Sequence, residues 1–201
     1  EVKSAVRELR KEFSIRGIKN LCFGLIDADF EGDPPPGDFF ITDTHDIETL
    51  SVKSEAFEVF VEHSIDSEKL RQFLISNEWP VEEGASGLRG YLCSCATDLG
   101  RLRWVSLNKR YKLRFKVLRP LDDYLDLSNL KFKVKEVVNF FKSFEPWKLA
   151  DRNILKAVED KNWDRLGKWL VVQGHDLCFV LAVGLDQFGA PQNMEESDYE
   201  E

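Results

Sequence analysis

Two groups of acidic residues have the spacing that metal-dependent chemistry requires. Asp27 and Asp29 follow one apolar run, and Asp43, Asp46 and Glu48 follow another. Side chains two apart on a strand point to the same face, so Asp27 and Asp29 could jointly hold one hard cation. Such a cation would stabilise the charge on a cleaved phosphodiester and activate a water molecule. An Asx turn that closes the strand would produce the same acidic pair.

The second group has two interpretations. Asp43, Asp46 and Glu48 could complete a metal site, or they could cap a helix and offset its dipole, which is the commoner role of such a segment taken alone. Two apolar strands that each end in acids also match the rule that α/β sheets carry their sites at the carboxyl ends of strands. The loop between the strands is shorter than a usual parallel crossover, so a hairpin that separates the two groups stays possible.

A late motif, Gly174-His175-Asp176-Leu177, stands before the last expected helix. A lone histidine at a helix start is more often a loop residue with a local hydrogen bond than a metal ligand. Asp176 fits the acidic first turn of a helix.

Basic residues are concentrated between positions 101 and 119, where the sequence has no acidic residue. From Tyr111 to Val117, apolar and basic residues alternate, which predicts a strand with one buried face and one basic face. The basic face consists of Lys112, Arg114 and Lys116. These cations could follow a phosphate backbone, or they could protect a solvated sheet edge.

The periodicity of the remaining chain predicts an α/β fold with a helical annex. A helix is expected over 2–13, a buried strand over 21–26 and a second short strand over 39–41, followed by a helix whose start lies at 42–48. Apolar stripes predict further helices over 54–61, 67–76, 83–108, 134–144 and 176–185. We expect one domain over 1–188, with the annex at about 54–108 and 134–187, and an acidic mobile tail at 189–201. The aromatic residues expected to anchor the last third are Trp147, Trp163 and Trp169.

Composition narrows the class of protein. The 201 residues carry a formal net charge of −8, which argues against a protein that coats nucleic acid by bulk electrostatics. No apolar run approaches the roughly 20 residues that span a bilayer, so we expect a soluble, cytoplasmic protein with no membrane contact.

The chain has no Walker A loop and no G-x-S-x-G elbow, which argues against ATP hydrolysis and serine chemistry. Reduced core thiols rather than zinc ligands are expected at Cys22, Cys93, Cys95 and Cys178.

Three motifs in order resemble the domain of unknown function family 4435. They are the segments 23–30 (FGLIDADF), 41–48 (ITDTHDIE) and 174–177 (GHDL). This family is similar to Toprim nucleases and includes the effector nuclease of the anti-phage system PARIS. The resemblance covers roughly 21–185.

The resemblance implies a Toprim-like sheet core and a Mg²⁺- or Mn²⁺-dependent endonuclease effector in bacterial antiviral defence. It implies an AAA or ABC-type ATPase as controlling partner, DNA or tRNA as substrate, and a possible homodimer. Asp27 and Asp29 would take the catalytic and metal-binding roles, with Asp43, Asp46 and Glu48 as further ligands. The family gives no role for His175 and Asp176.

The sequence departs from the Toprim pattern at its start. Toprim domains open on a strand with a glutamate in a V-E-G-x-x-D context, and nothing before Leu21 matches it. Because the chain starts at Glu1 rather than Met, we expect that this strand has been trimmed. The alternative is an inactive binding or regulatory module that docks an ATPase partner or nucleic acid.

Overall fold

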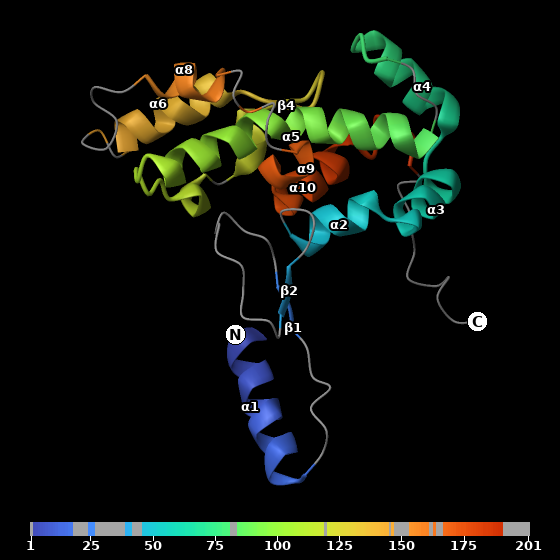
Figure 1. Ribbon diagram of the computed structural model, residues 1–201. Coiled ribbons are helices and arrows are strands. Elements are labelled where there is room, and N and C mark those ends of the chain that lie inside the picture. The colour runs from blue at the N-terminus through green and yellow to red at the C-terminus, as the bar shows by residue number, and fades with distance from the viewer. Residues whose placement is uncertain are drawn as a thin grey trace.

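The fold consists of a helical body and a small sheet that lies below it in Figure 1. The computed structural model describes residues 2–17, 24–26, 39–41, 46–80, 84–118, 120–144, 146, 153–160, 163 and 167–190. Most of the described residues are helical. The longest helix, α5 (Gly84–Asn108), runs through the middle of the body.

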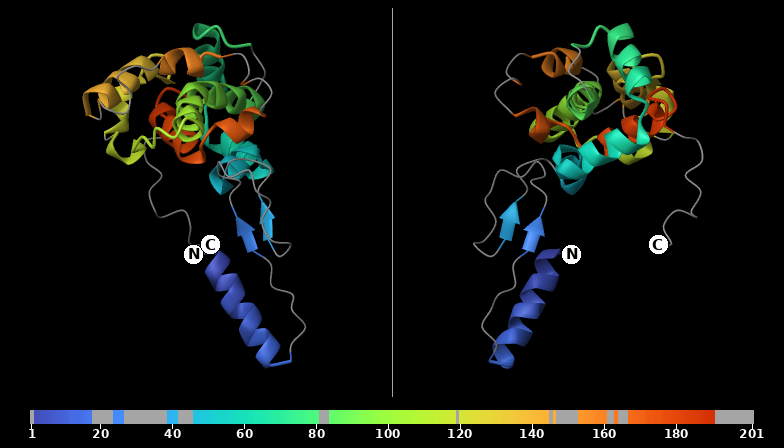
Figure 2. Two further views of the ribbon diagram at one scale, coloured as in Figure 1. Left: turned by 60° about the vertical axis from the view of Figure 1, so that its left-hand side comes forward. Right: turned by 90° about the vertical axis from the view of Figure 1, so that its right-hand side faces the viewer.

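The small sheet has two parallel strands. Helix α1 (Val2–Ile15) precedes strand β1 (Gly24–Ile26), and β1 pairs with β2 (Phe39–Ile41). The register places Ile26 beside Ile41, and both strands point toward the helical body in Figure 2. The pairing excludes the hairpin alternative, because parallel strands have their carboxyl ends at the same edge.

Three helices of the annex follow the sheet. They are α2 (Ile47–Lys53), α3 (Glu55–Ser64) and α4 (Ser67–Ser76). Asp46 caps α2, and Asp66 caps α4 by accepting from the backbone N–H groups of Glu68 and Lys69. Acids therefore define both helix starts, as their position before an apolar stripe predicts.

Helix α5 is the centre of the hydrophobic core. It contacts α3, α4, α8 (Ile154–Val158), α9 (Lys168–Val171), α10 (Gly174–Gly184) and strand β4 (Lys131–Phe132). A helix surrounded in this way must be apolar on most sides. Its fully buried side chains include Leu88, Tyr91, Leu92, Leu99 and Leu102.

The strand expected over 111–117 does not form. Arg110 and Lys112 both have positive φ angles, 55° and 52°, which no strand accommodates. Ser106 Oγ accepts the backbone N–H of Leu113 at 2.9 Å, and a 3₁₀ turn η1 (Phe115–Val117) follows. The expected alternation of burial is present without a strand, because Leu113 is buried while Lys112 and Arg114 are exposed.

The chain after this turn returns to α5. A second 3₁₀ turn η2 (Leu121–Tyr124) leads into a short antiparallel pair, β3 (Leu125–Asp126) with β4. Helix α6 (Val134–Phe144) then packs beside α8, and its bounds match the sequence prediction. Of the expected aromatic anchors, Trp163 and Trp169 are half-buried against the core, and Trp147 lies outside the described residues.

The fold class is therefore α/β only in its coarse form: the described residues are largely helical and form a two-stranded parallel sheet and a short antiparallel pair. A Toprim sheet core does not follow from the described strands. Within the described part of the chain, every helix is too short or too polar to cross a bilayer.

The described cysteines are free thiols with different exposure. Cys93 and Cys95 are buried on α5, whereas Cys178 on α10 is exposed, so the expectation of a core thiol is wrong there. Cys22 lies outside the described residues. Burial raises the pKa of Cys93 to about 11 and that of Cys95 to about 12.

These differences predict selective thiol labelling. Iodoacetamide at pH 8 should alkylate Cys178 at least about tenfold faster than Cys93 or Cys95, because the thiolate is the reactive form and buried thiols hold their protons. Peptide mapping by mass spectrometry separates the sites, and labelling in 6 M guanidinium is the control. Equal native rates at the three sites would contradict the described packing of α5.

Candidate metal centre

Asp46 joins the starts of two helices that are distant in sequence. Its Oδ1 accepts the backbone N–H of Thr49 at 2.8 Å and also the Thr49 hydroxyl. Its Oδ2 accepts the backbone N–H of Gly174, the first residue of α10, at 2.7 Å. One buried carboxylate therefore caps α2 and satisfies an N–H group at the start of α10.

Gly174 is required by this contact. A Cβ at position 174 would overlap Asp46 Oδ1 and Glu48 Cβ, and it would lie 2.7 Å from the backbone nitrogen of Thr49. The absence of a side chain lets the start of α10 approach the first turn of α2. This close approach explains why glycine precedes His175 in the late motif.

Glu48 and His175 complete a group of three possible metal ligands with Asp46. One ligand atom from each lies within 4.8 Å of the others, and His175 Nε2 is 3.7 Å from Glu48 Oε1. The three residues differ in their exposure to solvent. Asp46 is 4% exposed, whereas the His175 side chain is 74% exposed. The group is therefore anchored on the inside and open to solvent on the outside.

The donor set of this group is one imidazole nitrogen and two carboxylates. Mg²⁺ prefers oxygen ligands alone, whereas Mn²⁺ and other transition metals accept imidazole. The three capping hydrogen bonds use most of the acceptor capacity of Asp46, and the start of α10 favours negative charge. The group therefore offers ligand atoms of the types that hold metal ions in proteins.

The sheet edge is adjacent to this group along the chain. Asp27 directly follows the last residue of β1, and Asp43 lies two residues after the end of β2. Four residues separate Ile41 from Asp46, so the two Cα atoms are five steps apart along the chain and at most about 18 Å apart. Asp27, Asp29 and Asp43 themselves lie outside the described residues.

Asp176 has a structural role that the sequence did not reveal. Its carboxylate is 1% exposed and forms a bidentate pair with Arg103 of α5, at 2.8 and 3.0 Å. The Arg103 guanidinium also lies 4.5 Å from the centre of the Phe115 ring. Burial raises the pKa of Asp176, and the charge of Arg103 acts in the opposite direction. The pair fixes α10 to α5 and so determines where His175 lies.

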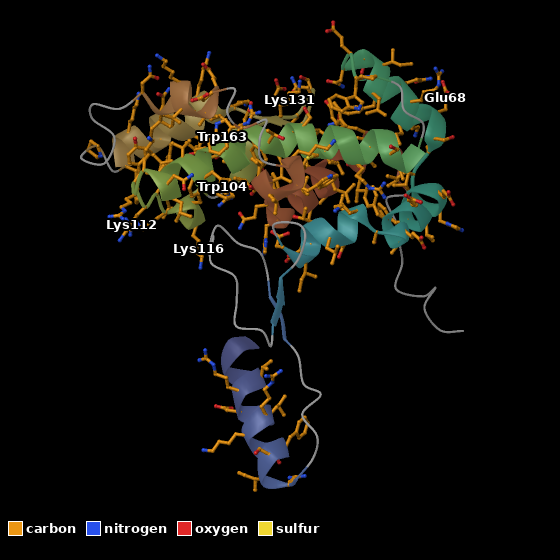
Figure 3. The ribbon with its side chains drawn as sticks, in the orientation of Figure 1. Glu68, Trp104, Lys112, Lys116, Lys131 and Trp163 are labelled. Carbon is orange, nitrogen blue, oxygen red and sulfur yellow. The ribbon has the colours of Figure 1, made fainter. Side chains whose placement is uncertain are left out.

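The basic residues are not part of this group. Lys112 and Lys116 lie near the carboxyl end of α5, and their side chains point away from the body in Figure 3. Arg114 lies over the Phe144 ring at 5.5 Å. The three cations are exposed, and whether they bind nucleic acid stays a prediction.

The sequence signals part of this arrangement. Its pattern indicates that Asp46 can cap a helix, but it does not reveal the hydrogen bond of Asp46 to a residue 128 positions away. In the sequence, Arg103 is one basic residue among many, and nothing there marks it as the partner of Asp176.

No family model, no curated protein and no solved structure matches this chain.

The tight contact at Gly174 predicts a stability cost for any side chain there. Gly174→Ala should lower the free energy of unfolding by about 1–3 kcal/mol, because the added methyl group must displace Asp46 or the start of α2. Urea denaturation measures the change. Gly167→Ala is the matched control, since a Cβ there meets nothing within 4 Å and φ is −56°. Equal stability of the two variants would contradict the described approach of α10 to α2.

The buried ion pair predicts a larger effect. Arg103→Leu should cost about 3–5 kcal/mol at pH 7, because it leaves the Asp176 carboxylate buried without its partner. The cost should shrink as the pH falls, since a protonated Asp176 carries no charge. Adding Asp176→Asn to Arg103→Leu should recover part of the loss.

Arg71→Leu is the matched control for this experiment. Arg71 pairs with Glu68 on the surface of α4, where both side chains are at least half exposed, so its loss should leave stability nearly unchanged. Equal and small effects of Arg71→Leu and Arg103→Leu would show that the buried pair does not hold α10.

Proposed function

We propose that this chain is a metal-dependent endonuclease of Toprim type, with its metal at the edge where β1 and β2 end. The parallel register of the two strands carries the proposal, because Ile26 and Ile41 are direct partners. The chain therefore leaves both strands at the same edge of the sheet, and acidic residues follow each strand there. Asp46, Glu48 and His175 form a group only a few residues farther along the chain.

The proposed ligands divide into a fixed part and an accessible part. Asp46 is held by three hydrogen bonds and cannot reorient without uncapping α2. Glu48 and His175 are open to solvent, and Asp27, Asp29 and Asp43 supply the remaining charge. A divalent cation bound here would stabilise the charge that develops on a phosphodiester and would activate a water molecule.

The residues of the chain would perform two further tasks. His175 would bind the cation through a ring nitrogen, and Glu48, which lies 3.7 Å from its Nε2, would take the proton of the attacking water. The imidazole also favours Mn²⁺ over Mg²⁺ in this group.

The biological setting of the proposal depends on the motif resemblance. An AAA or ABC-type ATPase would control the nuclease in anti-phage defence, DNA or tRNA would be its substrate, and further strands would extend β1 and β2 into a Toprim sheet. The net charge of −8 is consistent with assembly of the substrate channel by a partner, because the chain repels nucleic acid overall.

A second candidate function is an inactive binding or regulatory module. It is favoured by the exposed cations Lys112, Arg114 and Lys116, none of which belongs to the group of possible metal ligands. Reversing all three charges should abolish capture of an ATPase partner or of nucleic acid if these residues form the docking surface. Unchanged binding of both would remove this surface from consideration.

The nuclease proposal predicts metal-dependent cleavage. The protein should cut plasmid DNA or tRNA with Mn²⁺ or Mg²⁺ but not with EDTA, and Asp27→Asn or His175→Ala should reduce the rate at least about a hundredfold, as loss of a ligand or proton donor does. Gel electrophoresis follows the products. Asp122→Asn, which neutralises an exposed acid on η2, is the control.

The assay is repeated with the ATPase partner present if the protein alone is inactive. Cleavage that appears only with the partner, and that Asp27→Asn removes, would support the proposal. No cleavage under either condition, or cleavage that Asp27→Asn leaves unchanged, would refute it.

A further inference from the structure

Arg89 joins the central helix α5 to the carboxyl end of α2. Its Nε donates to the carbonyl oxygen of Val52 at 2.8 Å, and its Nη2 donates to the carbonyl oxygen of Ser54 at 3.2 Å. The last carbonyl groups of a helix have no partner within the helix, and a cation is favoured beside them. The Arg89 side chain is only 17% exposed, so losing it would leave these carbonyl groups poorly paired.

Arg89 also fixes the first turn of α3. The same Nη2 lies 3.2 Å from Glu58 Oε1, and the guanidinium carbon lies 5.5 Å from the centre of the Phe57 ring. A guanidinium presents its N–H groups in a rigid, planar fork. Contacts with two carbonyl groups, a carboxylate and a ring face therefore hold the junction between α2 and α3 at one place on α5.

Arg89 and Arg103 lie on the same side of α5. They are 14 positions apart, which is close to four whole turns and about 21 Å along the helix. Arg103 binds the start of α10 through Asp176, whereas Arg89 binds the end of α2. Helices α2 and α10 both lie below α5 in Figure 1, and they pack against each other.

Three attachments therefore connect these helices in a closed triangle. Arg89 joins α5 to α2, Asp46 joins α2 to α10, and the pair of Arg103 with Asp176 joins α10 to α5. Each helix of the triangle is held by polar contacts at two places. A helix that is held in this way cannot turn about a single attachment.

The attachment at Arg89 bears on the position of Glu48. Glu48 and Val52 are four residues apart, so they lie on the same face of α2. The hydrogen bond from Arg89 to Val52 thus holds the far end of the face that carries Glu48. Without this bond, Asp46 would still cap the start of α2, but the helix could turn about that cap and carry Glu48 away from His175.

We propose that Arg89 is a positioning residue for the metal centre and holds Glu48 at its place beside His175. The inference rests on the proposed function, because it takes Asp46, Glu48 and His175 as one metal group. Arg89 acts on this group through the backbone of α2. Residues that orient metal ligands from outside the coordination shell typically change metal affinity about ten- to a hundredfold.

Titration of Mn²⁺ followed by EPR tests this role, because the signal of free Mn²⁺ falls as the ion binds. Arg89→Met keeps an apolar stem beside Phe57 and removes every N–H donor, so it should weaken Mn²⁺ binding at least about tenfold. Arg89→Lys keeps the charge and one donor group, so its loss of affinity should be smaller. Circular dichroism checks that each variant is folded.

A double-mutant cycle separates positioning from a general effect on stability. If Arg89 acts through Glu48, Arg89→Met/Glu48→Gln should bind Mn²⁺ within about twofold of Glu48→Gln alone. If Arg89→Met does not fold, Arg89→Lys takes its place in the cycle. The matched control is Phe141→Leu, which leaves a cavity in the core beside α6 and should lower stability while Mn²⁺ affinity changes by less than about twofold.

The outcomes distinguish this inference from the proposed function. No Mn²⁺ binding by the unmodified protein, or undiminished binding by Glu48→Gln, would refute the metal group itself. The positioning role alone is overturned if Glu48→Gln loses affinity while both Arg89 variants keep it, or if the two losses add in the double variant. It is also overturned if Phe141→Leu loses as much affinity as Arg89→Met.

Discussion

The carboxylate of Asp46 is the interaction on which the candidate site depends. It accepts hydrogen bonds from Thr49 in α2 and from Gly174 in α10, two segments separated by more than half of the chain. Because Asp46 is buried, removing these bonds would leave unpaired N–H groups at two helix starts. The bridge fixes Glu48 and His175, which lie on those same helix starts, beside each other.

A second constraint acts from the other side of α10. Arg103 holds Asp176 against α5, so the start of α10 is bound to α2 through one residue and to the central helix through another. His175 lies between these two attachments and is itself exposed. Rigid attachment of the backbone with an accessible side chain is the arrangement that a ligand or proton donor requires. The same attachments explain the glycine and the aspartate on either side of His175.

The local parts of this arrangement could be predicted from the sequence, and the non-local parts could not. The amphipathic stripes located α4, α5 and α6 almost to the residue, because helix periodicity is a local property. The segment 111–117 alternates as a strand does, but positive φ angles at Arg110 and Lys112 prevent pairing there. Parallel pairing of β1 with β2, and the partners of Asp46 and Asp176, join residues that no local pattern relates.

The central claim is that Asp46, Glu48 and His175 share one metal ion, and the imidazole resonances test it most directly. Mn²⁺ broadens the NMR signals of nearby nuclei by its unpaired electrons, most strongly those of its own ligands. Substoichiometric Mn²⁺ should broaden the His175 signals before those of His63, which lies on α3 and contacts the carbonyl of Val59 through Nδ1 at 2.8 Å. Addition of EDTA should restore them. Equal broadening of His175 and His63, or none at either residue with one equivalent of Mn²⁺, would contradict the account.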